Sequence, residues 1–191
     1  MKRAVDLLLA TFFLVVTAPL IALAALAVWI EDSGSMLFRQ TRVGLHGSDF
    51  ELLKLRTMIT GAEHQGAGYA VDRDDPRITR VGRLLRRHRI DELPQIINIL
   101  RGEMSWIGPR PEAISLAEWY EREIPFYVYR HIVRPGISGW AQVHQGNVAA
   151  VDAAKLKLEY DFYYIKHFSF WLDAIIAMKS VRAIVTCFGS R

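Results

Sequence analysis

The sequence contains little cysteine and none of several common catalytic motifs. Its 191 residues include one cysteine, Cys187, so no internal disulfide can form, which fits a reducing compartment. The six histidines are scattered without metal-ligand spacing, and nothing supports a zinc site. Walker A, GxGxxG, HExxH, paired CxxC and GxSxG sequences are also absent. These absences argue against P-loop, dinucleotide-binding, zinc-protease and α/β-hydrolase chemistry.

Internal repeats, low-complexity tracts and long linkers are absent too, and the length suits one modest domain with its own core. Hydrophobic residues make up 51% of the chain, which is slightly apolar for a soluble protein. The net charge of +4 makes phosphorylated or anionic partners plausible. This basic excess is local, since residues 72–89 hold seven arginines and three aspartates.

An apolar segment near the N-terminus accounts for the high hydrophobic fraction of the chain. Residues 7–30 carry no formal charge, and a helix of that length would measure roughly 36 Å, enough to cross a bilayer. Three interpretations compete: a cleaved secretory signal, a simple transmembrane anchor, and a re-entrant helical hairpin that enters and leaves one leaflet. Pro19 favours the hairpin, because it would divide the segment into two arms of about eleven residues, each too short to cross. Flanking basic residues favour keeping both ends in the cytoplasm.

Periodicity and turn residues predict the remaining elements. The expected elements are a short strand at 50–56 and helices at 81–89, 91–101, 112–123, 151–166 and 170–188. The polar, glycine-containing stretch 61–75 is either plain surface or a lid. The last helix either packs in the core or lies at a membrane interface, which its leading aromatic residues Phe168, Phe170 and Trp171 would suit.

An adjacent acidic pair, Asp91 and Glu92, is the strongest candidate for chemistry. Asp91 could simply cap the helix expected at 91–101, since acids complement a helix N-terminus. The arginines just upstream, Arg86 among them, favour a functional role, because they would keep Asp91 ionised. An ionised aspartate can hold a hard cation such as Mg²⁺ or act as a nucleophile.

Further cations stand in rigid or regular settings. Arg110 lies between two prolines, which reduces the entropy lost on orienting it, and arginine suits bidentate phosphate recognition. Lys54 and Arg56 are two residues apart and would share one face of the expected strand. An exposed, solvated role is the alternative for all three. A non-catalytic module that binds acidic lipid or nucleic acid would need such arginines but not Asp91.

Five blocks in one order resemble the bacterial sugar transferases, the monotopic phosphoglycosyl transferases. The blocks are Lys-Leu-Arg-Thr-Met at 54–58, Asp-Asp-Pro-Arg-Ile-Thr-Arg-Val-Gly at 74–82, Ile-Asp-Glu-Leu-Pro-Gln at 90–95, Gly-Pro-Arg-Pro at 108–111 and Arg-Pro-Gly-Ile-Ser-Gly-Trp at 134–140. Each block is weak alone, but the ordered set is specific and covers essentially the whole chain. The chain looks like a minimal catalytic version without further transmembrane helices.

The resemblance implies a helix-rich α/β fold. Residues 33–191 are expected to form a compact cytoplasmic catalytic domain with short strands and interfacial C-terminal helices. Residues 1–32 are expected to form a re-entrant membrane hairpin that bends at Pro19. The resemblance also implies transfer of a sugar-1-phosphate from a UDP-sugar to polyprenol phosphate, with Mg²⁺ and release of UMP, at the cytoplasmic face of the bacterial inner membrane. Asp91 matches the nucleophile and magnesium-associated position, and Glu92 matches its partner carboxylate. Arg110 matches the phosphate-contacting arginine of the Pro-Arg-Pro turn, and Arg86 matches a basic position five residues before the nucleophile. Lys54 and Arg56 match the basic strand motif. Membrane lipid is an expected partner, nucleic acid is not, and the oligomeric state stays open.

Two departures from the family pattern bear on these expectations. The hairpin often breaks at Ser-Pro, whereas Ala18 precedes Pro19 here, and the bend is expected to survive. Relatives commonly carry Asn-Gly-Arg where residues 144–146 read His-Gln-Gly. If that segment helps to choose the sugar, the sugar specificity of this chain differs from theirs. The Gly-Trp-Ala-Gln motif at 139–142 resembles that of small relatives that handle N-acetylated amino sugars.

Overall fold

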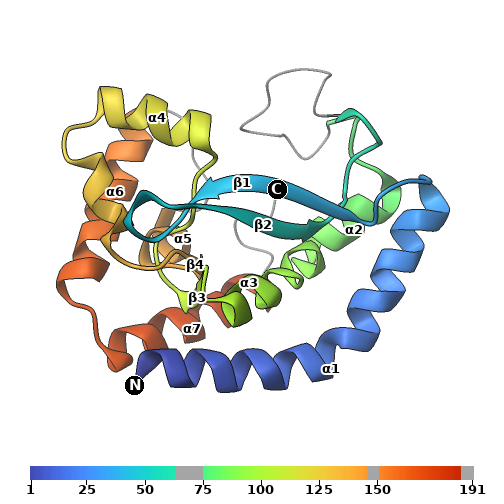
Figure 1. The fold of residues 1–191 in the computed structure, drawn as a ribbon, viewed down its shortest axis with the longest axis horizontal. Helices are drawn as coiled ribbons and strands as arrows, with labels where there is room; N and C mark the ends of the chain where they lie inside the picture. Colours follow the sequence, from blue (N-terminus) through green and yellow to red (C-terminus); the bar gives the residue numbers. More distant parts are fainter. Residues whose placement is uncertain (63–74, 146–150, 186–191) are drawn as a thin grey trace.

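A computed structural model of the protein describes residues 1–62, 75–145 and 151–185. Within these ranges the chain is mostly helical, with two small two-stranded sheets (Figure 1). This confirms the expected helix-rich class with few short strands. The elements are α1 (Lys2–Glu31), β1 (Leu37–Val43), η1 (Leu45–Gly47), β2 (Asp49–Leu55), α2 (Arg80–Arg87), η3 (Ile90–Glu92), α3 (Gln95–Arg101), β3 (Ser105–Ile107), α4 (Ile114–Glu123), η4 (Tyr127–Ile132), β4 (Gly136–Ser138), α5 (Trp140–Gln145), α6 (Val151–Lys166) and α7 (Phe170–Val185).

Helix α1 is a single helix of 30 residues that runs through Pro19 and bends near its middle (Figure 1). The expected hairpin of two separate arms is therefore not confirmed. An interior proline removes one backbone hydrogen bond and kinks a helix, but the turns on either side keep their own bonds and the helix continues. At about 1.5 Å per residue the whole helix follows a path of about 45 Å.

The outer side of α1 is an exposed apolar surface. By length and composition it is the one helix, among the described residues, that could cross a membrane. Only four of its residues are buried, and the large apolar side chains it exposes are Val5, Leu8, Leu9, Phe12, Phe13, Val15, Val16, Leu20, Leu23, Leu26, Trp29 and Ile30. An apolar patch of this extent indicates a surface that another apolar phase covers.

The N-terminal end of α1 is bound to the folded domain by polar contacts. Lys2 Nζ lies 2.6 Å from Oδ2 of Asp173 at the start of α7. The buried carboxylate of Asp6 accepts a hydrogen bond of 2.9 Å from Ser105 Oγ in β3. These contacts explain why an aspartate is tolerated at the edge of an apolar helix.

The C-terminal end of α1 is bound to the same domain. The Glu31 carboxylate accepts the backbone N–H groups of Arg80 and Val81, at 2.7 and 2.8 Å, and so satisfies the free donors at the start of α2. Asp32 accepts the backbone N–H of Thr60 at 2.8 Å. Both ends of the helix therefore meet one polar domain.

The central sheet is an antiparallel hairpin of β1 and β2, paired from Leu37 with Leu55 to Val43 with Asp49. Strand β2 matches the expected strand within one residue, whereas β1 was not expected. Helix α3 and the first half of α1 pack against β2 through an apolar cluster that includes Leu52, Ile96 and Ile99. The stretch 61–75 expected as surface or lid lies largely outside the described residues.

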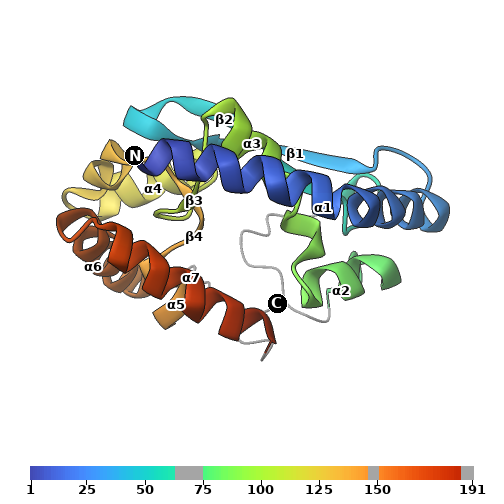
Figure 2. The ribbon, with the colours of Figure 1, turned by 90° about the horizontal axis from the view of Figure 1, so that it is seen from below.

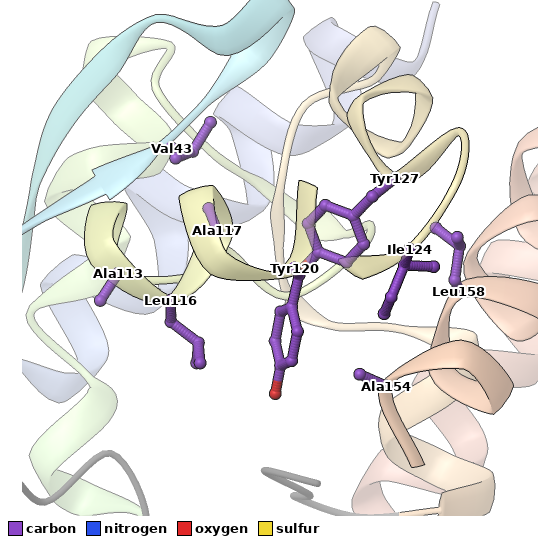
Figure 3. Packing of buried hydrophobic residues seen from close by; sticks show 9 residues of the cluster. All are labelled: Val43, Ala113, Leu116, Ala117, Tyr120, Ile124, Tyr127, Ala154 and Leu158. Atoms are coloured by element: carbon purple, nitrogen blue, oxygen red, sulfur yellow. The ribbon is translucent and has the colours of Figure 1, made fainter. Parts of the chain in front are cut away.

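A second apolar cluster joins α4, η4 and α6 (Figure 3). The rings of Tyr120 and Tyr127 lie 5.3 Å apart at its centre, next to Ile124 and Leu158. Helix α6 has the expected bounds, and α4 begins two residues later than expected. Helix α7 packs in the core through Ile176, which is fully buried. Phe170 and Trp171 at its start are more than 70% exposed, and their place at a membrane interface stays a prediction.

Helix α2 approaches the end of β2 closely because it carries glycine at the point of contact. A Cβ atom at Gly82 would lie only 2.1 Å from the backbone oxygen of Thr57. Thr79 caps the helix by accepting the Gly82 N–H, and Thr57 also accepts the N–H of Thr79 at 3.1 Å. The glycine therefore sets the depth at which α2 docks.

We predict that Gly82→Ala destabilises the protein by about 1–3 kcal/mol, because the added methyl group must push α2 away from Thr57. Chemical or thermal unfolding in detergent measures this. The control is Arg83→Ala on the exposed side of the same helix, which should change stability by less than about 0.5 kcal/mol. Equal unfolding midpoints for Gly82→Ala and the parent would contradict the proposed close approach.

Candidate functional site

The acidic pair occupies a sharp turn between α2 and α3. Arg89 adopts the left-handed conformation, with φ of 55°, and the next three residues form the single turn η3. Asp91 does not cap the following helix as expected, because α3 starts at Gln95 with Pro94 at its N-cap position. Proline lacks an N–H, which suits a helix start and moves that start beyond the acidic pair. Asp91 and Glu92 thus lie in the turn that precedes α3 and not in the first turn of that helix.

Glu92 is surrounded by cations from three parts of the chain. Its carboxylate lies 2.7 Å from Arg110 Nη2, 3.1 Å from Lys54 Nζ and 3.8 Å from Arg89 Nη1. Burial opposes ionisation of this side chain, but Arg110 and Lys54 outweigh it and hold the pKa of Glu92 well below its usual range. Glu92 is therefore a fixed anion whose main contacts are already made.

Asp91 is in the opposite situation. Its side chain is 8% exposed, and within the part of the chain that the structure describes no hydrogen bond or ion pair engages its carboxylate. Burial raises the pKa of Asp91, and Lys54 partly offsets that effect. A nearly buried carboxylate without a partner is costly to the fold, which is common where a side chain is kept free for a ligand or a reaction.

Arg86 is placed beside the acidic pair, whereas Arg56 is not. Arg86 Nε donates to Thr57 Oγ1 at 2.8 Å, and its charge favours the ionised form of Asp91. Strand β2 ends at Leu55, and Arg56 turns to the end of α1, where it contacts Asp32 and donates to Thr60 Oγ1 at 2.7 Å. The expectation that Arg56 joins Lys54 on one functional face is therefore not supported, because the strand stops between them.

The Pro-Arg-Pro turn at 109–111 is held through its backbone. Each of its three carbonyl oxygens accepts one hydrogen bond: the first from the Gly136 N–H at 2.9 Å, the second from Arg130 Nη2 at 2.9 Å and the third from Arg42 Nη1 at 3.1 Å. Two proline rings and three hydrogen bonds leave the turn little freedom. The Arg110 guanidinium is consequently directed at Glu92 with little loss of entropy on binding a ligand.

Arg130, which holds the turn, is itself fixed by a buried ion pair. Its Nη2 and Nε lie 2.7 and 3.0 Å from Asp161 Oδ2, and the two residues are 2% and 1% exposed. Lys157 and Glu112 form a second buried pair next to it. Sequence reasoning missed these residues, although a lone aspartate among the aromatic side chains of 160–164 could have signalled a buried partner.

The assembled site has more positive than negative groups. Lys54, Arg86, Arg89 and Arg110 surround two carboxylates, of which Glu92 is already compensated. The described residues contain no group of three or more His, Cys, Asp or Glu side chains that could hold a metal ion. The excess of positive charge favours an anionic group, such as a phosphate, next to Asp91.

Comparisons with known proteins all point to one family, and each covers nearly the whole chain. A family model described as bacterial sugar transferase matches residues 1–187. The chain is 50% identical over 190 residues to a UDP-N-acetylgalactosamine-undecaprenyl-phosphate N-acetylgalactosaminephosphotransferase of Aeromonas hydrophila, and it is matched over its full length but spans 45% of that relative. It is 43% identical over 187 residues to a UDP-glucose:undecaprenyl-phosphate glucose-1-phosphate transferase of Caulobacter vibrioides, covering 97% of this chain and 70% of the relative. An exopolysaccharide production protein of Rhizobium leguminosarum is 37% identical over 192 residues, which cover 97% of this chain and 96% of that protein.

The two carboxylates should differ in their effects on stability. Asp91→Asn should raise the free energy of unfolding at pH 7, because the raised pKa of Asp91 means that its ionised form opposes folding. Glu92→Gln should lower it by about 3–5 kcal/mol, because Lys54 and Arg110, whose side chains are each only 18% exposed, lose their counter-ion. Urea unfolding in detergent measures both effects.

The two variants should also differ in how their stability depends on pH. Glu92 stabilises the fold above the unfolded pKa of about 4.3, and this contribution is lost as pH falls through its lowered pKa, so Glu92→Gln should be less sensitive to acid than the parent. The gain from Asp91→Asn should grow as pH rises from the unfolded value of about 3.9 through the raised pKa of Asp91. Equal destabilisation by both variants at pH 7 would refute this division of roles.

Proposed function

Because the chain belongs to the bacterial sugar transferase family, we propose that it transfers a sugar-1-phosphate from a UDP-sugar to undecaprenyl phosphate and releases UMP. The names of its relatives supply the donor and acceptor classes. The observation that carries the proposal for this chain is the unpaired Asp91 carboxylate within a group of cations.

The first step is attack by a carboxylate oxygen of Asp91 on the phosphorus that bears the sugar. A bond forms between that oxygen and phosphorus, the bond from phosphorus to the bridging oxygen breaks, and UMP leaves with the bonding electrons. Arg110, Lys54 and Arg86 are placed to neutralise the phosphate oxygens as charge shifts. Glu92 keeps Arg110 and Lys54 in position rather than reacting itself.

The second step returns the enzyme to its starting state. An oxygen of the lipid phosphate attacks the phosphorus of the phosphosugar-aspartyl intermediate, the acyl-phosphate bond breaks, and Asp91 is regenerated as a carboxylate. Dividing the transfer in this way lets one carboxylate serve a soluble donor and a lipid acceptor in turn.

Mg²⁺ fits this site as a partner of the substrate rather than as a resident of a protein cage. Magnesium usually keeps several waters and binds one or two carboxylates together with substrate phosphates. Asp91 offers one uncompensated carboxylate, and the described residues hold no larger acidic group. When bound, the ion would withdraw charge from the diphosphate, while Arg110 and Lys54 orient it.

The anchoring of α1 supports a monotopic arrangement at the cytoplasmic face of the inner membrane. Lys2 contacts α7, and Glu31 contacts the start of α2, so both ends of the apolar helix meet the same domain. A helix held in this way cannot place its ends on opposite sides of a bilayer. Residues 1–32 then form a bent segment that enters and leaves one leaflet. Residues 33–191 form the cytoplasmic domain, with the exposed aromatics of α7 at the interface.

We propose an N-acetylated amino sugar as the donor sugar. The Aeromonas hydrophila relative, at 50% identity, is named for N-acetylgalactosamine, whereas relatives named for glucose are 37–43% identical. His144, which replaces a residue common in the family, stacks 5.3 Å from the ring of Tyr160 and lies beside Trp140. These aromatic rings are the side chains to vary if sugar choice is to be altered.

Release of UMP from purified protein in detergent, with undecaprenyl phosphate and a panel of UDP-sugars, tests the function. The parent should release UMP fastest with a UDP-N-acetylhexosamine. Asp91→Asn should reduce the rate by at least about 10³-fold, because a carboxamide cannot form the acyl phosphate. With donor alone, the parent should gain the mass of one phosphosugar and the variant should not.

Arg39→Gln, an exposed arginine of β1, is the matched control and should keep the parent rate. Parent-level transfer by Asp91→Asn would overturn the nucleophile assignment. Lipid binding without any UMP release from the parent would favour a non-catalytic module.

Cysteine labelling tests the topology in a Cys187→Ser background. Ala4→Cys and Ser33→Cys should both react with a membrane-impermeant maleimide only after cells are lysed, because both ends lie in the cytoplasm. Leu20→Cys near the bend should react poorly both before and after lysis, because it would lie within the membrane. Labelling of residue 4 or residue 33 from outside intact spheroplasts would rule out the proposed arrangement.

A further inference from the structure

A cavity lined by both charged and apolar side chains lies at the opposite end of the fold from the C-terminal anchor of α1. It has a volume of about 230 Å³ and opens beside the first turns of α1, between β3, η4 and α6. Its lining includes Lys2, Arg3, Arg134, Tyr164 and Phe168. Asp91, Glu92 and Arg110 do not line it, so it is separate from the site of the proposed reaction.

Three cations, Lys2, Arg3 and Arg134, line the cavity together with a single carboxylate, that of Asp6. Lys2 is paired with Asp173. The carboxylate of Asp6, also in the lining, already accepts hydrogen bonds from Ser105 Oγ and the Trp106 N–H. No carboxylate of the described residues pairs with Arg3 or with Arg134. The cavity therefore favours an anion.

The donors of the two arginines point to an anion with several oxygens. Arg3 Nη2 donates to the Leu100 carbonyl at 3.3 Å, but its Nη1 is buried without a hydrogen-bond partner among the described residues. Arg134 uses Nε to hold the Gly102 carbonyl at 3.0 Å. A buried guanidinium nitrogen without an acceptor is unfavourable, and a phosphate oxygen would supply one.

The cavity lies where the polar domain meets apolar surface. Leu8 and Leu9 are exposed on α1 one turn beyond Val5, and Phe168, Phe170 and Trp171 are about half or more exposed at the start of α7. Figure 2 shows α1 and α7 together on the face seen from below. An anion in this cavity would thus lie at the level of lipid headgroups, with apolar side chains on its membrane side.

We propose that this cavity binds the phosphate group of an anionic phospholipid, with Arg3 and Arg134 as its main donors and the acyl chains along the first half of α1. A soluble phosphate would satisfy the same donors but would leave the adjoining apolar surface uncovered. This inference rests on the membrane placement of α1 proposed above, but it does not depend on the proposed sugar-phosphate transfer.

Native mass spectrometry of delipidated full-length protein in detergent tests the proposal, because it removes the general attraction of a charged bilayer. The parent should bind one phosphatidylglycerol more tightly than phosphatidylcholine. The double variant Arg3→Gln, Arg134→Gln should weaken phosphatidylglycerol binding by about tenfold or more, as loss of two cations near a lipid phosphate implies. Arg39→Gln with Arg122→Gln removes the same charge from exposed positions and should change binding by less than about twofold.

Equal binding of the two lipids by the parent, equal weakening in both double variants, or full displacement of phosphatidylglycerol by millimolar inorganic phosphate would each overturn the proposal. Displacement by undecaprenyl phosphate with a raised KM in the arginine double variant would instead assign the cavity to the acceptor, and would also overturn it. UMP release by that variant in detergent should stay within about twofold of the parent, because the two arginines lie outside the reacting site. This readout separates failure of the inference from failure of the proposed function.

A photo-crosslinker keeps the test open if the double variant does not fold. p-Benzoylphenylalanine in place of Ile132, which lines the cavity, should capture phosphatidylglycerol in the otherwise unchanged protein. The same group in place of Val128, which is exposed on η4 but does not line the cavity, should capture much less. Equal capture at both positions would contradict a defined site.

Discussion

The ionised Glu92 carboxylate organises the centre of this molecule. Lys54 comes from the end of β2, Arg89 from the turn after α2 and Arg110 from the turn after β3, and all three meet on this one side chain. Their attraction lowers the pKa of Glu92 despite its burial, so the carboxylate stays charged and the cations stay together. Asp91, one residue earlier, is left without a partner in the positive environment that its neighbour has assembled.

Support for this centre comes from layers further inside the fold. Asp161 of α6 pairs with the buried Arg130, and Arg130 donates a hydrogen bond to the backbone carbonyl of Arg110. Helix α6 therefore helps to fix the position of the Arg110 side chain. Glycine at position 82 lets α2 dock closely on Thr57, which also receives a hydrogen bond from Arg86. The apolar helix α1 is bound to this domain at both ends, so its exposed apolar surface is fixed relative to the cations around Glu92.

Local pattern was a good guide to some elements and a poor one to others. Residues 151–166 form the expected helix because their periodicity and length leave no competing structure, and β2 differs from expectation by one residue. The helix expected from Asp91 instead begins at Gln95, since Pro94 suits a helix start better than an interior position. Strand β1 has polar and apolar residues in no clear alternation, and it is a strand because β2 pairs with it. The proline in α1 predicted a bend correctly but not that the helix would continue through it.

Residue types and their order alone identified the family, the apolar N-terminal segment, the acidic pair and Arg110, because each of these depends on chemistry that is local in sequence. Tertiary structure decided which members of that set act together. It directed Lys54 to Glu92 and Arg56 to Asp32, although the two cations are only two residues apart, because β2 ends between them. It also decided which carboxylate is neutralised and which stays free, since that depends on contacts between segments such as residues 54 and 92 or 92 and 110, and no local pattern encodes those distances.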